Sequence, residues 1–158
     1  TLAQTKFANL INIINNQGDI PELLQTQCTA DKIGKKLNVE IKMNPYFPIV
    51  TVPHMRGAVL AQEKGVLDKY NEKMFEAIWI KALNLNDQII LSEVATESGI
   101  DGNEFAEGIM SDGIKEGLKI NTQYAVDNGA FGVPTFYFNN EMYWGIDSMK
   151  FLIEDLNK

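Results

Sequence analysis

Residues 129–149 read GAFGVPTFYFNNEMYWGIDSM, and this stretch decides the fold. Its two short runs rich in aromatic residues, Pro134 to Phe138 and Glu141 to Trp144, are typical of β-strands. Asn139-Asn140 between them tolerates the positive φ of a tight turn. The stretch therefore predicts a hairpin, and a closing helix is expected to follow it.

A helical block is expected before this hairpin, from about residue 53 to residue 128. Pro53 suits a first helical turn, so a helix is expected from there to about residue 64. Asp87 and Asp101 are suited to cap two later helices. Upstream, Val39 to Met43 alternates and predicts a short strand. The pattern is that of an α/β protein whose helices form a contiguous insertion between strands.

Composition limits the partners of the chain. With 158 residues, 45% of them hydrophobic, it is long enough for one domain with a substantial core. Lys and Arg number 14 against 21 Asp and Glu, and the net charge of −7 argues against nucleic acid and against an anionic membrane surface. No apolar run approaches the roughly 18–20 residues of a transmembrane helix. We expect neither nucleic acid nor a membrane as a partner.

The chain has one cysteine and one histidine. Cys28 alone excludes an intrachain disulfide and a Cys-x-x-Cys redox pair, and we interpret it as a structural thiol. His54 is interpreted as structural, and no metal is expected. The sequence shows no secretory signal pattern, and a lone cysteine fits a reducing compartment, so a cytoplasmic protein is expected. Trp79 and Trp144 are both expected in the core.

The Val133-Pro134 pair has two interpretations. If the bond between the two residues is cis, the backbone N–H and C=O of Val133 turn outward and can pair with an extended peptide ligand as an added strand would. The alternative is an ordinary trans proline at the start of a strand, where its missing N–H does least harm. The pair alone does not decide between them.

The wider context resembles a known family. Gly129-Ala-Phe-Gly-Val-Pro-Thr135, the hairpin, Trp144-Gly-Ile-Asp147 and the closing helix resemble the C-terminal half of a thioredoxin fold. More narrowly, they resemble the 2-hydroxychromene-2-carboxylate isomerase family, relatives of kappa-class glutathione transferases and DsbA-type oxidoreductases. Met43-Asn-Pro-Tyr-Phe-Pro-Ile49 and Met55-Arg-Gly-Ala-Val-Leu-Ala-Gln62 agree with this. The resemblance covers about residues 38–158.

The resemblance implies the fold and its division. It implies an α/β, thioredoxin-like fold of the DsbA/kappa type with a large helical insertion. One thioredoxin-like domain would span residues 1–158, with the insertion at about 53–128 and the C-terminal hairpin plus helix at 130–158.

A glutathione site is also implied. Val133 would meet the cysteinyl backbone of glutathione beside cis-Pro134, and Asp147 and Ser148 would hold its γ-glutamyl end. Helix-terminal N–H groups accept a carboxylate, and the Asp147 carboxylate can pair with an ammonium. The alternative for Asp147 is an N-cap only. Asn16 is a further expected contact with glutathione.

An aromatic acid is the implied substrate. By resemblance, it would be lined by Asn44, Pro45, Phe47 and Pro48, which could equally be a double-proline connector that needs no ligand. Arg56 could clamp a substrate carboxylate in a bidentate pair, or it could be solvated in the first helical turn.

The sequence departs from the family at its start. Members carry a Ser, or a Cys in the oxidoreductases, at the start of the first helix, and this residue activates the thiol. Thr1-Leu-Ala-Gln-Thr5 fits either the helix after that position or the segment before a second strand that begins at Lys6. The N-terminal strand and active-site segment are therefore expected to be missing, and the catalytic residue is not assigned.

Three functions follow as hypotheses. The first is a glutathione-dependent isomerase of the 2-hydroxychromene-2-carboxylate type that acts on an unsaturated aromatic acid. The second is a DsbA-like thiol–disulfide oxidoreductase, for which the chain lacks a cysteine pair. The third is a catalytically incomplete thioredoxin-like binding domain. The resemblance leaves a homodimer open.

Overall fold

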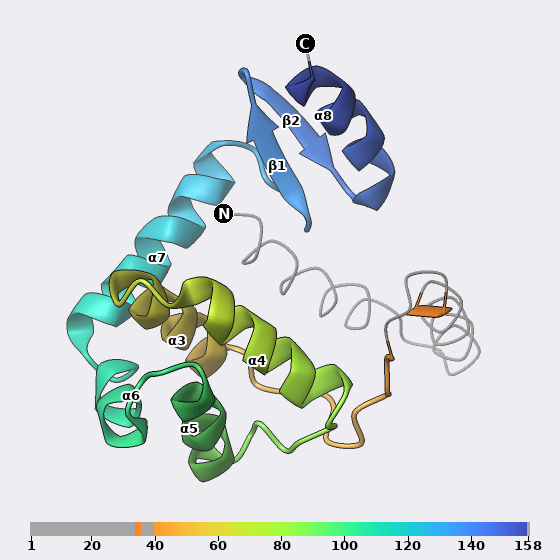
Figure 1. Cartoon of the computed structure of the whole chain (residues 1–158). Helices are drawn as coiled ribbons and strands as arrows, with labels where there is room; N and C mark the ends of the chain where they lie inside the picture. The colour runs from red at the N-terminus through yellow and green to blue at the C-terminus, as the bar shows by residue number, and fades with distance from the viewer. Residues whose placement is uncertain (1–33, 36–39, 158) are drawn as a thin grey trace. The chain divides into compact units, whose positions relative to one another are not determined.

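The computed structural model describes residues 34–35 and 40–157. The described residues divide into two compact units, one within residues 34–35 and 40–121 and the other within residues 122–157. We call residues 34–35 and 40–121 the helical unit and residues 122–157 the hairpin unit. Figure 1 shows α3 to α6 in the first and β1, β2 and α8 in the second, while α7 contributes to both.

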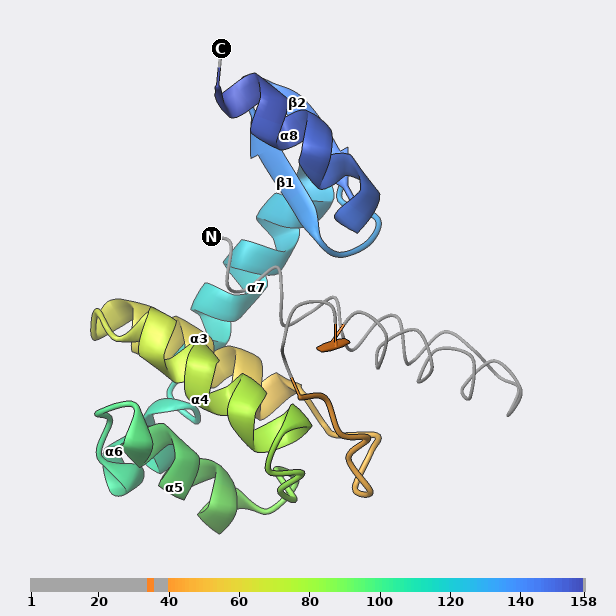
Figure 2. The ribbon, with the colours of Figure 1, turned by 45° about the vertical axis from the view of Figure 1, so that its right-hand side comes forward.

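The helical unit is built from short helices joined by tight loops. They are α3 (Val52–Glu63), α4 (Leu67–Trp79), α5 (Gln88–Glu97), α6 (Gly102–Gly108) and the first part of α7 (Asp112–Asp127). Helix α3 packs on α4, α4 on α5 and α5 on α6 (Figure 1, Figure 2). Within residues 34–35 and 40–157, none of the helices combines the length and the apolar character that crossing a membrane requires.

Two aspartates cap helices as the sequence predicts. The Asp87 side chain accepts a hydrogen bond from the N–H of Ile89 at 2.8 Å. The Asp101 side chain accepts bonds from the N–H groups of Asn103 and Glu104, both at 3.0 Å. Each bond satisfies a donor that has no acceptor inside the helix. These caps confirm the expected starts of α5 and α6.

A close approach between α3 and α4 holds the helical core together. The Tyr70 hydroxyl on α4 donates a hydrogen bond to the carbonyl of His54 on α3 at 3.0 Å. Gly57 makes room for this contact, because a Cβ at that position would lie 2.1 Å from the Tyr70 hydroxyl oxygen. The Phe105 ring of α6 packs 6.1 Å from the Tyr70 ring, centroid to centroid. Other buried core residues are Ala61, Met74, Ala77, Ile78, Trp79, Leu85, Leu91, Val94, Ala95, Ile100 and Ile109.

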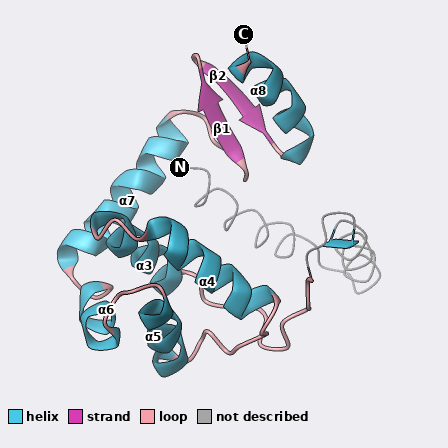
Figure 3. Ribbon diagram, in the orientation of Figure 1, coloured by secondary structure: helices cyan, strands magenta, loops and turns pink. Residues whose placement is uncertain are grey.

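The hairpin unit has a small core between its two strands and the last helix. Strands β1 (Thr135–Phe138) and β2 (Glu141–Trp144) pair antiparallel, and Figure 3 shows them as two magenta arrows beside α8 (Met149–Leu156). Asn139 and Asn140 have φ of 49° and 65°, which confirms the predicted tight turn. The buried cluster of Phe136, Tyr143 and Leu152 is packed by Phe138 and Met149.

One expected strand is not present. Residues 40–43, the described part of the predicted strand 39–43, do not form a β-ladder. Instead, the Lys42 N–H donates to the carbonyl of Trp79 at 2.6 Å. The sequence of this segment alternates, but its Lys42 N–H pairs with the end of α4 instead of with a neighbouring strand. The strand prediction is therefore wrong for residues 40–43, whereas Trp79 is buried as expected.

The only histidine of the chain is predicted to titrate far below its ordinary range. Burial lowers the pKa of His54 from 6.5 to about 4, although a hydrogen bond with the Val50 backbone acts in the opposite direction. Because the unfolded chain takes up this proton at a higher pH, the folded chain should lose about 2 kcal/mol of stability from this group between pH 7 and pH 5.

A proton NMR titration measures this directly, since one histidine gives one set of ring signals. The midpoint should lie near pH 4 in the folded chain and near pH 6.5 in urea. A folded-state midpoint at 6 or above would contradict the buried, neutral imidazole.

Candidate functional site

The loop before β1 leaves a backbone donor and acceptor unpaired. The Val133–Pro134 bond is cis, and the Thr135 hydroxyl donates to the Gly132 carbonyl at 2.6 Å, which closes the loop. Within the described part of the chain, neither the N–H nor the C=O of Val133 has a hydrogen-bond partner. Pro134 is buried and Val133 half-buried. The loop therefore presents the N–H and the C=O of Val133, both unpaired within the described residues, next to the hairpin.

A single hydrogen bond ties this loop to the start of the last helix. The Gly145 N–H donates to the Pro134 carbonyl at 2.9 Å. Gly145 directly precedes the 3-10 turn η1 (Ile146–Ser148), which leads into α8. The predicted residues Val133, Pro134, Asp147 and Ser148 thus come together at one end of the hairpin unit.

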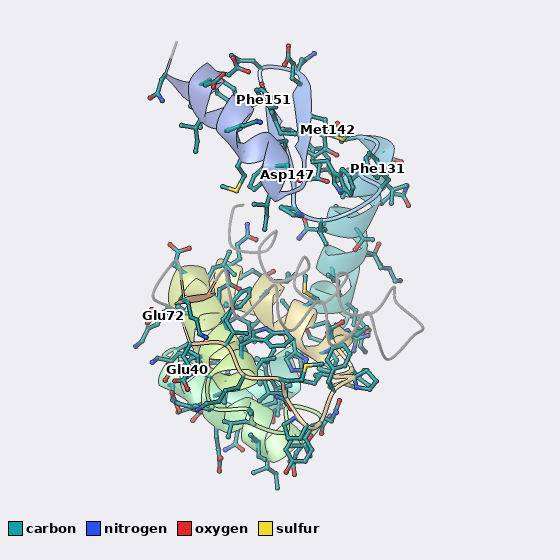
Figure 4. The ribbon with its side chains drawn as sticks, turned by 90° about the vertical axis from the view of Figure 1, so that its right-hand side faces the viewer. Glu40, Glu72, Phe131, Met142, Asp147 and Phe151 are labelled. Atoms are coloured by element: carbon teal, nitrogen blue, oxygen red, sulfur yellow. The ribbon has the colours of Figure 1, made fainter. Side chains whose placement is uncertain are left out.

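Asp147 and Ser148 do not cap α8 through their side chains. Ser148 is at the N-cap position, but its φ of −81° and ψ of −13° are helical rather than extended, and its hydroxyl donates to the Gly145 carbonyl at 2.9 Å. The Asp147 carboxylate is exposed at the start of the helix (Figure 4) and has no hydrogen bond or ion pair with the described residues. The alternative of a side-chain N-cap by Asp147 is therefore not what the structure shows, and the carboxylate stays unpaired among the described residues.

Two exposed aromatic rings lie beside the loop. Trp144 is 51% exposed and Phe131 69% exposed, and their ring centroids are 5.0 Å apart at 46°. The expected burial of Trp144 is wrong, because Tyr143 already points into the core and neighbouring strand residues face opposite sides. A Cβ on Gly132 would lie 2.5 Å from Nε1 of Trp144, so the indole covers the loop backbone. The alternation of side chains along β2 could have predicted that Trp144 is exposed. Sequence reasoning did not predict a role for Phe131.

Asn44 in the helical unit is engaged by the protein itself. It is 2% exposed, and its Nδ2 donates to the carbonyls of Ile78 at 3.1 Å and Leu83 at 2.9 Å. Its Oδ1 accepts from the N–H of Tyr46 at 2.9 Å. Contact with a ligand stays a prediction for Asn44, and the structure gives it a positioning role.

Asn86 holds the other end of the same segment. Its Oδ1 accepts from the Val50 N–H at 2.8 Å, and its Nδ2 donates to the Tyr46 carbonyl at 3.4 Å. Between the two asparagines, Pro45 and Pro48 are exposed and Phe47 is half-buried. The Phe47–Pro48 bond is cis. Sequence reasoning missed Asn86, whose signal is a polar residue in a short loop just before a helix cap.

Arg56 on α3 carries a buried donor without an acceptor. Its Nε is shielded from solvent and has no hydrogen-bond partner within the described residues. Buried polar groups are ordinarily paired, and a carboxylate is the partner that a guanidinium binds best. The predicted role in binding a carboxylate is not tested by this geometry, but the side chain retains a donor for it.

The structure does not describe two residues named in the sequence analysis. Asn16 and Cys28 lie outside the described residues. Within residues 34–35 and 40–157 there is no group of three or more His, Cys, Asp or Glu side chains placed to hold a metal ion. The described residues thus provide two sets of candidates, one in each unit, and no assigned thiol-activating residue.

Comparison with known proteins identifies similar chains. Residues 16–157 match the family described as DSBA-like thioredoxin domain. A 2-hydroxychromene-2-carboxylate isomerase of Pseudomonas sp. (strain C18) is 30% identical over 86 residues, which cover 54% of this chain and 40% of that protein. Isomerases of the same name from Pseudomonas putida and Sphingobium xenophagum are each 28% identical, over 54% and 60% of this chain.

The matches span less than half of these relatives, 40%, 41% and 49% of their lengths. A solved structure of a 2-hydroxychromene-2-carboxylate isomerase matches 99% of this chain and 76% of its own chain, with a TM-score of 0.64 and 21% identity. These findings confirm the predicted DsbA-like thioredoxin fold and the predicted family resemblance.

Replacement of Asn44 by alanine is expected to destabilise the helical unit. The substitution leaves two buried carbonyls and one N–H without their partner, which should lower the free energy of unfolding by about 2–4 kcal/mol in urea denaturation. Asn103→Ala is the matched control, because Asn103 is exposed and its side chain makes no hydrogen bond within the described residues. Equal effects of the two substitutions would contradict the role of the Asn44 amide.

Proposed function

We propose, on the premise that this chain belongs to the family of DSBA-like thioredoxin domains, that it is a glutathione-dependent isomerase of the 2-hydroxychromene-2-carboxylate type. Its substrate would be an unsaturated aromatic acid. The proposal is supported by the likeness to three relatives that carry this isomerase name. A second support lies at one end of the hairpin unit, where the N–H and C=O of Val133 and the carboxylate of Asp147 have no partner among the described residues.

The observation that carries the proposal is the bond from the Gly145 N–H to the Pro134 carbonyl. It joins the loop that carries Val133 to the segment that carries Asp147, and neither the N–H and C=O of Val133 nor the carboxylate of Asp147 has a partner in the described part of the chain. A γ-glutamyl peptide offers the complementary groups, namely a backbone donor and acceptor in its centre and an ammonium at one end. Val133 would pair with the peptide backbone, and Asp147 would bind the ammonium.

Ser148 adds a further polar group to this end. Because its hydroxyl hydrogen is used on the Gly145 carbonyl, its oxygen is left as an acceptor for a donor on the ligand. Bound glutathione supplies a thiolate, which can add reversibly to an electron-poor double bond and so allow rotation about that bond. The residues of this chain bind and orient; which group lowers the pKa of the thiol is not assigned.

In the helical unit, the residues that the sequence suggests for the aromatic acid include one candidate partner for its carboxylate. Arg56 has a buried Nε that still lacks an acceptor, and a substrate carboxylate would provide one. Phe47, between two prolines, is half-buried and offers an apolar surface. Asn44 and Asn86 fix the backbone on which Phe47 is carried.

The thiol–disulfide alternative requires a second cysteine, because Cys28 is the single cysteine among residues 1–158 and such chemistry exchanges a pair. A binding domain without catalysis would share the glutathione site, and the two are separated by turnover of an unsaturated aromatic acid rather than by affinity.

Glutathione affinity tests the proposal. Titration calorimetry should show saturable binding to the full chain, and Asp147→Asn should weaken it about 10- to 100-fold, as expected for the loss of one charge-assisted hydrogen bond. Glu154→Gln is the matched control, because Glu154 is an exposed carboxylate on the same helix, α8, beyond its first turn.

Glu154→Gln should leave the affinity unchanged, and both variants should keep the melting temperature of the parent. Absence of binding at millimolar glutathione would overturn the proposed function. Binding that Asp147→Asn does not weaken would overturn the assignment of Asp147.

A further inference from the structure

We propose that Phe131 and Trp144, here called the aromatic wall, contact the aromatic group of the substrate as it reaches the sulfur of bound glutathione. The inference rests on the proposed function and deepens it, because it names residues that select the substrate class. The aromatic wall belongs entirely to the hairpin unit, so the argument needs only that unit.

Both rings of the aromatic wall are exposed to solvent, although the hairpin unit has an apolar core. Five side chains of the hairpin unit, three from the strands and two from α8, form an apolar cluster, and both wall residues lie outside it. With exposed fractions of 69% for Phe131 and 51% for Trp144, the two rings forgo much of the burial that ordinarily stabilises aromatic side chains. Exposed aromatic rings held in contact with each other are typical of surfaces that bind a ligand.

The position of the indole is fixed rather than variable. Trp144 is the last residue of β2 and pairs with Thr135 in the ladder. Its ring covers Gly132 so closely that a Cβ there would lie 2.5 Å from Nε1, and Phe131 packs on it from the other end of the loop. A ring held in this way loses little conformational entropy when a ligand stacks on it.

The aromatic wall directly adjoins the proposed anchor for the cysteinyl residue. Gly132, which the indole covers, is followed by Val133, whose N–H and C=O are unpaired within the described residues. A peptide whose central residue pairs with Val133 carries its side chain, and therefore its sulfur, next to this point. Polar groups that fix orientation, set beside an apolar surface that takes a ring, are the usual composition of a small-molecule site.

The occupant is an aromatic group rather than an aliphatic chain. Two rings at a centroid distance of 5.0 Å and an angle of 46° can extend their contact to a third ring, either edge-to-face or offset. An alkyl group would gain area burial but not this geometry. A preference for an aromatic substituent on sulfur is therefore the measurable consequence.

Three ligands and the full chain test this inference. Glutathione, S-methylglutathione and S-benzylglutathione are titrated by calorimetry, and the benzyl compound should bind about 3- to 10-fold more tightly than the methyl compound. Phe131→Ala and Trp144→Ala should each reduce that ratio toward one. Because the ratio compares two S-substituted ligands on the same variant, a change in affinity for the shared glutathione part cancels. Trp144→Phe keeps a ring and should retain part of the ratio.

Phe151→Ala is the matched control, since Phe151 is a 52% exposed aromatic residue of the same unit, on α8 outside the aromatic wall. It should leave the ratio unchanged. Tryptophan fluorescence gives a second readout, because Trp79 is buried and Trp144 exposed. S-benzylglutathione should change the emission of the parent and should not change that of Trp144→Phe.

The outcomes separate the two proposals. If glutathione binds but the benzyl preference is absent, or persists in both alanine variants, the aromatic wall is overturned and the proposed function stands. If glutathione does not bind, the proposed function fails. In that case, a fluorescence response of Trp144 to free benzoate would still support the aromatic wall as a binding surface. Absence of that response would overturn the aromatic wall too.

Discussion

The candidate site depends on one backbone hydrogen bond, from the N–H of Gly145 to the carbonyl of Pro134 at 2.9 Å. Without this bond the loop before β1 and the start of the last helix would be joined only through the strands. With it, the N–H and C=O of Val133, which have no partner among the described residues, and the exposed carboxylate of Asp147 belong to one short segment of structure. Proline makes the arrangement efficient, because it has no N–H of its own to satisfy while its carbonyl accepts the bond.

This segment is rigid because a small core supports it. Phe136 and Tyr143 face each other across the ladder and pack on Leu152 of α8. The Tyr143 hydroxyl donates to the Asp155 carboxylate at 2.6 Å, and this bond with burial raises the pKa of Tyr143 above its ordinary range, so the phenol keeps its proton. The side chains on the opposite face of β2, Trp144 among them, are not part of this core.

The sequence predicted best where a local rule decides the conformation. Asn139-Asn140 could form only a tight turn between two aromatic strands, and Asp87 and Asp101 could cap helices without tertiary help. Sequence reasoning failed where long-range contacts decide the conformation. The segment 40–43 alternates like a strand, yet the Lys42 N–H binds the carbonyl of Trp79, 37 residues away in sequence. No local sequence pattern indicates that Asn44 and Asn86 support one loop.

The distribution of hydrogen-bonded polar groups favours the hairpin unit as the location of the proposed glutathione site. In the helical unit, Asn44 makes three hydrogen bonds to backbone atoms, so its amide has little capacity left for a ligand. In the hairpin unit, Val133 and Asp147 keep theirs. The net charge of −7 disfavours anions in general, and glutathione carries two carboxylates beside its ammonium group. Local contacts with its ammonium, its peptide backbone and an apolar substituent on its sulfur must therefore outweigh that field. The physical case for a γ-glutamyl peptide is therefore stronger in the hairpin unit than the case for an aromatic acid is in the helical unit, where Arg56 alone supplies an unsatisfied cationic donor among the predicted substrate residues.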